Sequence, residues 1–250
     1  MILKKVYAWS IHLFTALGAV LGVLAIIYSI QAAQAATLSD FTSYYYYLKL
    51  SLYCVIIAII IDAVDGTLAR TVDIKKLAPF DGALLDNIID FTTYSIVPCI
   101  WIYVSGVVSE SWLIPSIVLI TISSSYQFCQ PNAKTNDNFF VGFPSYWNII
   151  VMLMLCFQTN QTANQTIILV LSIFSFIPIK YIYLSRLDNI SKSKIVKFIT
   201  LSYSIIASSI TVVAIYLFPQ KAPDEFLVII ITFIIFYIIF SFKLNIKPIK

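Results

Sequence analysis

The sequence has few charged residues. Asp, Glu, Lys and Arg make up 11% of its 250 residues, whereas 60% of the residues are hydrophobic. Because soluble domains carry about 25% charged residues, this composition excludes an ordinary soluble domain and indicates a protein that lies in lipid. The chain also lacks a linker, an internal repeat and a low-complexity tail, which favours a single integral-membrane domain over residues 1–250.

Cysteine and histidine are scarce as well. The four cysteines, Cys54, Cys99, Cys129 and Cys156, show no CxxC or metal-ligand spacing, and we interpret them as small packing residues. The one histidine, His12, has no Ser or Cys partner at a recognisable spacing. A covalent enzyme intermediate is therefore not expected.

Apolar runs fill most of the chain, and each candidate run is long enough to approach the roughly 20 residues that cross a bilayer core. Their residues do not alternate between apolar and polar, so they predict helices and not the strands of a barrel. We expect an all-α polytopic membrane helix bundle with about eight transmembrane helices. The predicted spans are 10–31, 44–64, 83–105, 112–130, 144–159, 165–184, 196–218 and 226–242.

Basic residues predict how the spans are oriented, since Lys and Arg gather in cytoplasmic loops. With both termini in the cytoplasm, 13 of the 16 basic residues lie on the inner side. These are Lys4, Lys5, Arg70, Lys75, Lys76, Lys134, Arg186, Lys192, Lys194, Lys197, Lys243, Lys247 and Lys250. The first run resembles a signal peptide, but its length and its polar face of Ser10, His12 and Thr15 favour a retained helix.

Acidic residues are concentrated in one short stretch. Six of the 12 fall between positions 62 and 90. Asp62 and Asp65 end the second predicted span, and Asp86 and Asp90 begin the third. Spacings of three and four residues put each pair on one helix face, and a short loop makes the two helices antiparallel neighbours. The sequence therefore predicts that four carboxylates converge at the cytoplasmic membrane boundary.

Such a cluster needs a counter-ion, because a carboxylate costs about 2.5–3.5 kcal/mol in a membrane helix and neighbouring carboxylates repel each other. An all-oxygen ligand set suits Mg²⁺ or Mn²⁺ better than Zn²⁺. The alternative is a set of helix-end charges that reach solvent, which would not require this spacing.

Small residues and one arginine accompany the carboxylates. Gly66, Ala69 and Gly82 leave helix faces nearly bare, so a flat ligand can approach the backbone. Arg70 is a bidentate partner for a phosphate at the same depth. Together with a metal, these residues predict a site that binds a diphosphate.

This pattern resembles the signature of the CDP-alcohol phosphatidyltransferase superfamily. The matching residues are Asp62, Asp65, Gly66, Ala69, Arg70, Gly82, Asp86 and Asp90. Eleven residues separate Arg70 from Gly82, which is similar to the longer gap of the bacterial phosphatidylcholine synthase branch. The stretches Trp9–Ala16 and Lys134–Asn148 resemble that branch too.

The resemblance implies that Asp62, Asp65 and Asp86 bind metal, and that Asp90 binds a second ion and acts as general base. It implies that Gly66, Ala69 and Arg70 contact the CDP part of CDP-diacylglycerol. We expect Gly82, Ser10, His12 and Thr15 to line the same lipid-nucleotide site. The expected reaction transfers the phosphatidyl group from CDP-diacylglycerol to choline and releases CMP, in the inner membrane of a bacterium and in a homodimer.

Choline carries a quaternary ammonium, which proteins bind with aromatic faces and carboxylates. The candidate choline ligands are Tyr94, Tyr126, Asp137 and Trp147, and ordinary packing explains each of them as well. Two alternatives stay open: a sibling enzyme that uses another alcohol, and a cation-coupled transporter with intramembrane carboxylates. No nucleic-acid partner is expected, because the basic residues form no patch.

Overall fold

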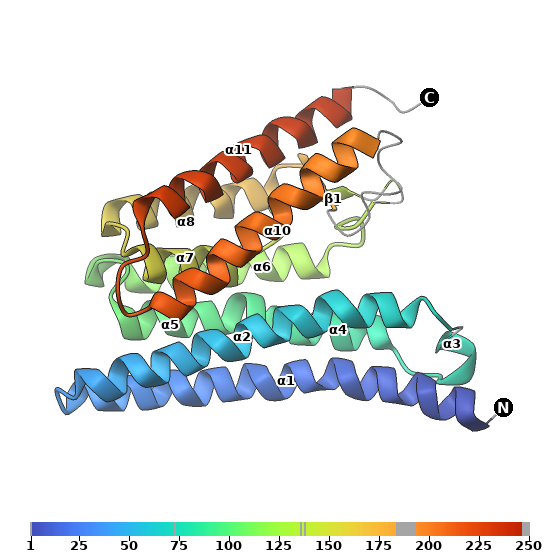
Figure 1. Ribbon diagram of the computed structural model, residues 1–250, viewed down its shortest axis with the longest axis horizontal. Coiled ribbons are helices and arrows are strands. Elements are labelled where there is room, and N and C mark those ends of the chain that lie inside the picture. The colour runs from blue at the N-terminus through green and yellow to red at the C-terminus, as the bar shows by residue number, and fades with distance from the viewer. Residues whose placement is uncertain (1, 73, 136, 138, 184–193, 247–250) are drawn as a thin grey trace. The chain divides into compact units, whose positions relative to one another are not determined.

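The computed structural model describes all residues except 1, 73, 136, 138, 184–193 and 247–250 (Figure 1). Arg186, Lys192, Lys247 and Lys250, four of the basic residues used to predict orientation, lie outside the described residues. The chain forms two compact units, Met1–Val104 and Ser105–Lys250. The single domain predicted over 1–250 stays a prediction.

Helices dominate both units. The first unit contains α1 (Ile2–Thr37), α2 (Phe41–Ala69), α3 (Ile74–Leu77), α4 (Gly82–Phe91), the π-helix η1 (Thr92–Ile96) and α5 (Val97–Ser105). The second contains α6 (Glu110–Cys129), β1 (Phe139–Val141), α7 (Trp147–Phe157), α8 (Gln161–Phe176), β2 (Lys180–Ile182), α10 (Lys194–Leu217) and α11 (Asp224–Ile246). The prediction of an all-α membrane bundle is confirmed.

Six helical segments among the described residues are long and apolar enough to cross a membrane. They are α1, α2, the continuous segment Gly82–Ser105, α6, α10 and the part of α11 from Asp224 to Lys243. Helices α7 and α8 occupy the fifth and sixth predicted places but have only 11 and 16 residues. At about 1.5 Å per residue, both are shorter than a hydrocarbon core of about 30 Å.

The sixth predicted span, 165–184, was wrong at its end. Helix α8 stops at Phe176, and Lys180–Ile182 form a strand. Pro178 explains the stop, because a proline disfavours helical backbone at the preceding residue, and Ile177 is indeed extended.

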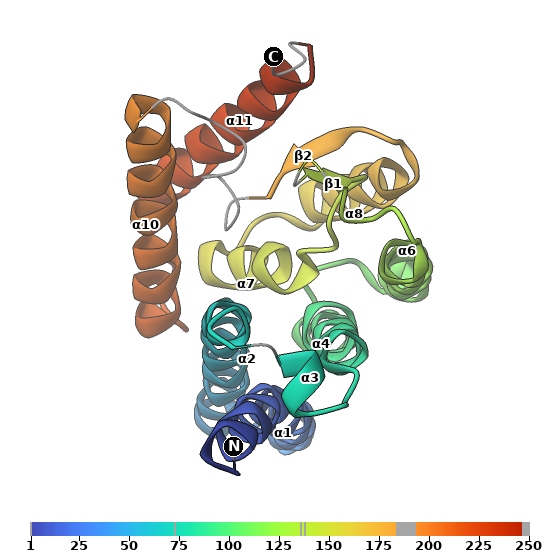
Figure 2. The same ribbon diagram turned by 90° about the vertical axis from the view of Figure 1, so that its right-hand side faces the viewer.

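The first unit is built on close contact between α1 and its neighbours. Helices α1 and α2 run side by side in opposite directions through the turn at 38–40 (Figures 1 and 2). Small residues line the buried face of α1, and a Cβ added to Gly18 would lie 2.9 Å from Cγ2 of Ile89 on α4. Small residues at a membrane helix interface let the backbones approach closely, so this face holds α4 beside α1.

A buried polar network joins α1, α2 and α5 midway along the helices. Trp101 donates its indole N–H to the Ser51 hydroxyl at 2.7 Å, and Ser51 donates to the Ala25 carbonyl at 2.8 Å. Ser29 and Ser51 hydroxyls lie 3.0 Å apart. Because lipid offers no other hydrogen-bond partner, such contacts fix which helix faces meet.

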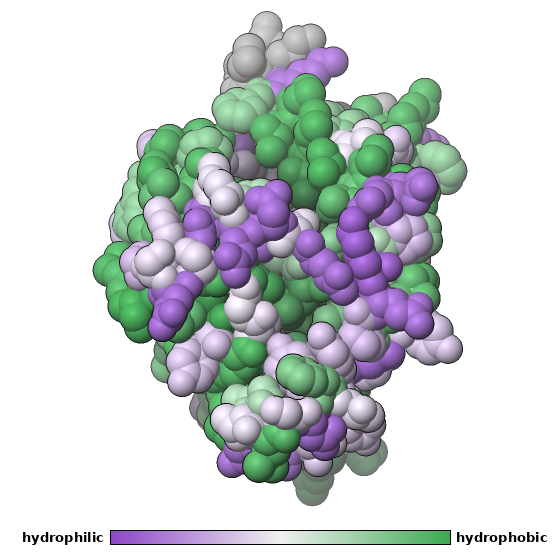
Figure 3. Space-filling view, turned by 90° about the vertical axis from the view of Figure 1, so that its left-hand side faces the viewer, coloured by the Kyte–Doolittle hydropathy of each residue, from purple (hydrophilic) through white to green (hydrophobic). Residues whose placement is uncertain are grey.

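In the second unit, β1 and β2 pair antiparallel, with Phe139 opposite Ile182. Helix α11 packs on this pair, and the Tyr237 hydroxyl donates to the Ile182 carbonyl at 2.9 Å. At the other end of the unit, Asn164 donates to the Val107 carbonyl at 2.7 Å, and Gln158 donates to the Pro219 carbonyl at 3.0 Å. Figure 3, which views the protein from the left-hand side of Figure 1, shows hydrophilic residues gathered at the helix ends.

Candidate functional site

Three carboxylates meet in the first unit. One oxygen from each of Asp62, Asp65 and Asp86 lies within 4.8 Å of the other two. Asp62 and Asp65 stand one turn apart near the end of α2, and Asp86 comes from α4. Asp81 caps α4 by accepting a hydrogen bond from the Leu84 backbone N–H at 3.0 Å, which fixes where the helix begins and thus where Asp86 lies.

The three donors fit a divalent cation. All are carboxylate oxygens, which hard ions such as Mg²⁺ and Mn²⁺ prefer. Asp65 is 6% exposed, and Asp62 and Asp86 are half-buried. A shared cation removes the repulsion that three partly buried carboxylates would otherwise meet. The predicted convergence of these three residues is thus found in the structure.

Asp90, the fourth predicted ligand, lies one turn beyond Asp86 on α4 and is 9% exposed. Among the described residues, the group that could hold a metal ion consists of Asp62, Asp65 and Asp86, without Asp90. Its roles as ligand of a second ion and as general base stay predictions.

Helix α1 supplies one wall of the cluster. The Thr15 hydroxyl interacts electrostatically with the Asp65 carboxyl group. It also lies 3.2 Å from the carbonyl of Ile11, one turn earlier. The predicted polar face of α1 therefore does meet the carboxylates, through Thr15.

His12 lies one turn before Thr15 and contacts α4. A Cβ added to Gly82 would lie 2.8 Å from Cε1 of His12, so a larger residue there would require the imidazole ring to shift. Phe80 and Trp9 border the same ring, with centroids at 5.0 and 6.1 Å. The His12 side chain is 7% exposed, and its Nε2 has no hydrogen-bond partner among the described residues. Buried polar atoms are usually paired, so this nitrogen is suited to accept or donate a hydrogen bond with a ligand.

The remaining predicted nucleotide contacts lie at the ends of α1 and α2. Arg70 is exposed and donates from Nη2 to the Thr67 hydroxyl at 2.9 Å. Its Nη1 passes 3.6 Å from the place where a Cβ on Gly66 would lie. Ala69 is half-buried, and Ser10 is exposed and donates to the Tyr7 carbonyl at 2.8 Å. The guanidinium of Arg70 thus lies at the exposed end of α2.

Tyr94 lies beside the carboxylates. Its hydroxyl donates to Oδ2 of Asp62 at 2.9 Å, from the π-helix η1 across to α2. Sequence reasoning placed Tyr94 one turn past Asp90 and assigned it to choline, and missed this contact with Asp62. It also missed the ring of Phe80 against His12. Neither contact can be predicted from residue spacing, because each joins residues on separate elements.

The other predicted choline ligands belong to the second unit. Trp147 is fully buried and meets the ring of Phe143 edge-on at 5.1 Å. Tyr126 is exposed and packs on Phe176 at 4.9 Å. Gly142 has a φ of +79°, where glycine is favoured, and it precedes the turn that leads into α7.

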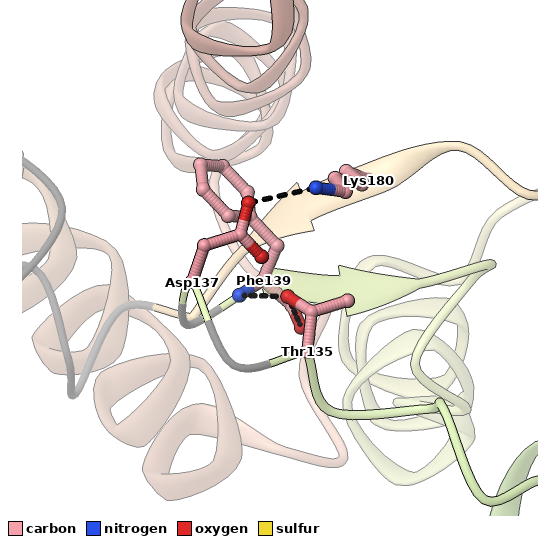
Figure 4. A network of polar contacts seen from close by, with 4 residues as sticks. All are labelled: Thr135, Asp137, Phe139 and Lys180. Atoms are coloured by element: carbon pink, nitrogen blue, oxygen red, sulfur yellow. Dashed lines mark hydrogen bonds and ion pairs between the residues drawn. The ribbon is translucent and has the colours of Figure 1, made fainter. Parts of the chain in front are cut away.

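Asp137 has a cationic partner within the protein. Its Oδ2 lies 2.7 Å from Nζ of Lys180, which also lies over the ring of Phe139 at 5.6 Å (Figure 4). The Thr135 hydroxyl accepts a hydrogen bond from the Phe139 backbone N–H at 3.0 Å. The hydrogen bond from Lys180, followed by one from Thr135, lowers the pKa of Asp137. Its assignment to choline stays a prediction.

Comparison with known proteins shows the family of the chain. No protein-family model matches the chain. Phosphatidylcholine synthase of Legionella bozemanae is 47% identical over 170 residues, which are 66% of this chain and 78% of that protein. The phosphatidylcholine synthase of Legionella pneumophila is 41% identical over 192 residues, 76% of this chain and 70% of the relative. That of Borreliella burgdorferi is 39% identical over 215 residues, 86% of this chain and 83% of the relative. With three clustered carboxylates on apolar helices and relatives of this similarity, the chain belongs to the phosphatidylcholine synthase family.

Proposed function

We propose that this membrane protein is an enzyme that transfers the phosphatidyl group from CDP-diacylglycerol to choline and releases CMP. The observation that carries the proposal is the convergence of Asp62, Asp65 and Asp86 within 4.8 Å, in a chain of the phosphatidylcholine synthase family. A diphosphate is the group in this substrate that requires such a cluster, because its charge must be neutralised before CMP can leave.

Asp62, Asp65 and Asp86 would hold a divalent cation, Mn²⁺ or Mg²⁺, and Asp90 with part of this set would hold a second ion. When bound, the ions neutralise the diphosphate and stabilise the departing CMP. Thr15 supports this arrangement, because its hydroxyl interacts with the Asp65 carboxyl group from α1.

The nucleotide half of the site lies between α1, the end of α2 and the start of α4. We assign Gly66, Ala69, Arg70, Gly82, Ser10, His12 and Thr15 to CDP-diacylglycerol. The buried Nε2 of His12, which has no partner within the part of the chain that the structure describes, supports a hydrogen bond to the nucleotide. The planar guanidinium of Arg70 at the membrane edge suits a phosphate oxygen.

The chemical step is a direct displacement. The choline hydroxyl oxygen forms a bond to the phosphorus of the phosphatidyl group, and the bond from that phosphorus to the CMP oxygen breaks. Asp90 accepts the proton of the hydroxyl as general base. Its position one turn beyond Asp86 on α4 supports this role, because it places the carboxylate beside the proposed metal site.

The choline half of the site is proposed on the aromatic residues Tyr126 and Trp147 and on Asp137. Aromatic faces bind a quaternary ammonium without needing a hydrogen-bond donor from it. We further propose that the protein is a homodimer in the bacterial inner membrane, with both termini and the metal cluster on the cytoplasmic side.

An acceptor panel tests the proposal. Purified protein in detergent, given CDP-diacylglycerol and Mn²⁺, should release CMP only when choline is added. Release with serine or glycerol phosphate instead of choline would identify a sibling enzyme. No release with any alcohol would contradict the enzyme assignment and favour transport.

A further inference from the structure

Tyr94 contacts Asp62, one of the proposed metal ligands. Its hydroxyl donates to Oδ2 of Asp62 at 2.9 Å, and Tyr94 is 9% exposed. The two residues are 32 positions apart, so the bond joins η1 to α2. A carboxylate whose second oxygen is held in this way keeps Oδ1 for a cation and loses its freedom to rotate.

The backbone fixes Tyr94 in this position. Residues Thr92–Ile96 form a π-helix, in which the Val97 N–H bonds to the Thr92 carbonyl, five residues earlier. Pro98 follows, has no N–H, and its ring would collide with the carbonyl of Tyr94 in a regular helix. The wider π turn relieves that collision. Single π turns are rare in proteins, and those that occur are often found at functional sites.

We propose that Tyr94 is a positioning residue that orients Asp62 for the divalent cation, and that it does not contact choline. This inference rests on the metal site of the proposed function. Residues that hydrogen-bond to metal ligands fix the orientation of those ligands, and their loss typically weakens metal binding by about 10–100-fold.

Metal binding without substrates gives the direct test. Purified wild-type protein, Tyr94→Phe and the control Tyr103→Phe are titrated with Mn²⁺, and free Mn²⁺ is measured by electron paramagnetic resonance. Tyr103 lies on the same continuous helix and is 64% exposed, so its hydroxyl should be dispensable. The Kd of Tyr94→Phe should rise about 10-fold or more, whereas that of Tyr103→Phe should equal the wild-type value. An unchanged Kd in Tyr94→Phe overturns the inference.

The same titration separates this inference from the proposed function. If the wild-type protein binds no Mn²⁺, both the metal site and the role of Tyr94 are wrong. If the wild-type protein and Tyr94→Phe bind Mn²⁺ equally, only the role of Tyr94 is wrong.

Kinetics distinguish positioning from choline binding. At saturating Mn²⁺, Tyr94→Phe should recover most of its kcat and keep the wild-type KM for choline. A choline KM that stays several-fold higher at saturating Mn²⁺ would show that Tyr94 contacts choline and would overturn the positioning role. The phenyl ring preserves packing, and a thermal melt of the apoprotein identifies any variant that fails to fold.

Discussion

At the residue scale, three of the four predicted aspartates form one carboxylate cluster, and the fourth, Asp90, is not part of that cluster. Asp62, Asp65 and Asp86 share a small space, and Asp90 lies a turn away on α4. This separation suits different duties, because a group that accepts a proton must keep an oxygen free of the cation. Asp90 is the residue on which the proposed base catalysis depends.

Replacing Asp90 with Asn removes the base and keeps the shape of the side chain. We expect kcat to fall about 10²–10⁴-fold, the usual contribution of a general base, while the Kd for CDP stays within about twofold. Enzyme assays and calorimetric titration with CDP measure the two effects. A variant that retains wild-type kcat would remove Asp90 as the base.

The matched control for this change is Asp81→Asn. Asp81 is exposed and caps α4, and Asn caps a helix about as well as Asp. The control therefore removes the same charge from the same helix without touching the carboxylate cluster, and it should keep wild-type kcat.

At the element scale, the spacing of the acidic residues predicted the cluster because helical periodicity is local. Asp62 and Asp65 share a face of α2 whatever the helix packs against, and a short connection leaves α4 little choice of neighbour. The contact between Tyr94 and Asp62 was not predictable in this way. It depends on the π turn before Pro98, which shifts the register of every later residue in that helix.

Close packing between α1 and α4 was also hidden from the sequence. The sequence predicted that Gly82 leaves a helix face open to a ligand. In the structure, the His12 ring lies closest to the position that a Cβ on Gly82 would take. The length of α8 was overestimated because Ile177–Ile179 is as apolar as the helix before it, and only Pro178 marks the end.

Gly82→Ala tests the contact between α1 and α4. The new Cβ would lie 2.8 Å from Cε1 of His12, so the imidazole must move away from its present position. We expect the KM for CDP-diacylglycerol to rise about 10-fold, the loss of roughly one hydrogen bond to the substrate. Helix propensity predicts the opposite sign for stability, since Ala favours a helix over Gly by roughly 0.5–1 kcal/mol.

The neighbouring residue provides the control. Ala83 is exposed on the same turn, so Ala83→Val adds volume without meeting His12 and should leave the KM unchanged. Equal effects of the two substitutions would indicate a general disturbance of α4, and an unaffected Gly82→Ala would contradict the assigned role of His12.

At the scale of the whole molecule, the described helices fit a multi-pass membrane protein. The order of α1, turn, α2 and the 71–81 connection places the turn at 38–40 and the connection at opposite ends of α2. If α2 crosses the membrane, those two segments face opposite compartments. The bias of basic residues assigns the 71–81 connection to the cytoplasm.

Cysteine labelling in intact cells tests this orientation. In a chain whose four native cysteines are replaced, Ser39→Cys should react with a membrane-impermeant maleimide. Lys76→Cys should react only after the cells are permeabilised. Both positions are exposed in the structure, so access depends on the compartment alone. The reverse pattern would contradict the proposed orientation.

The central claim is that the carboxylate cluster holds the cation needed for transfer to choline. The most direct measurement is the incorporation of radiolabelled choline into chloroform-soluble lipid by purified protein supplied with CDP-diacylglycerol. We predict that EDTA stops incorporation by the wild-type protein, that added Mn²⁺ restores it, and that Asp65→Asn shows at least about 100-fold less activity at any Mn²⁺ concentration. Incorporation that continues in EDTA, or that Asp65→Asn sustains at the wild-type rate, would contradict the claim.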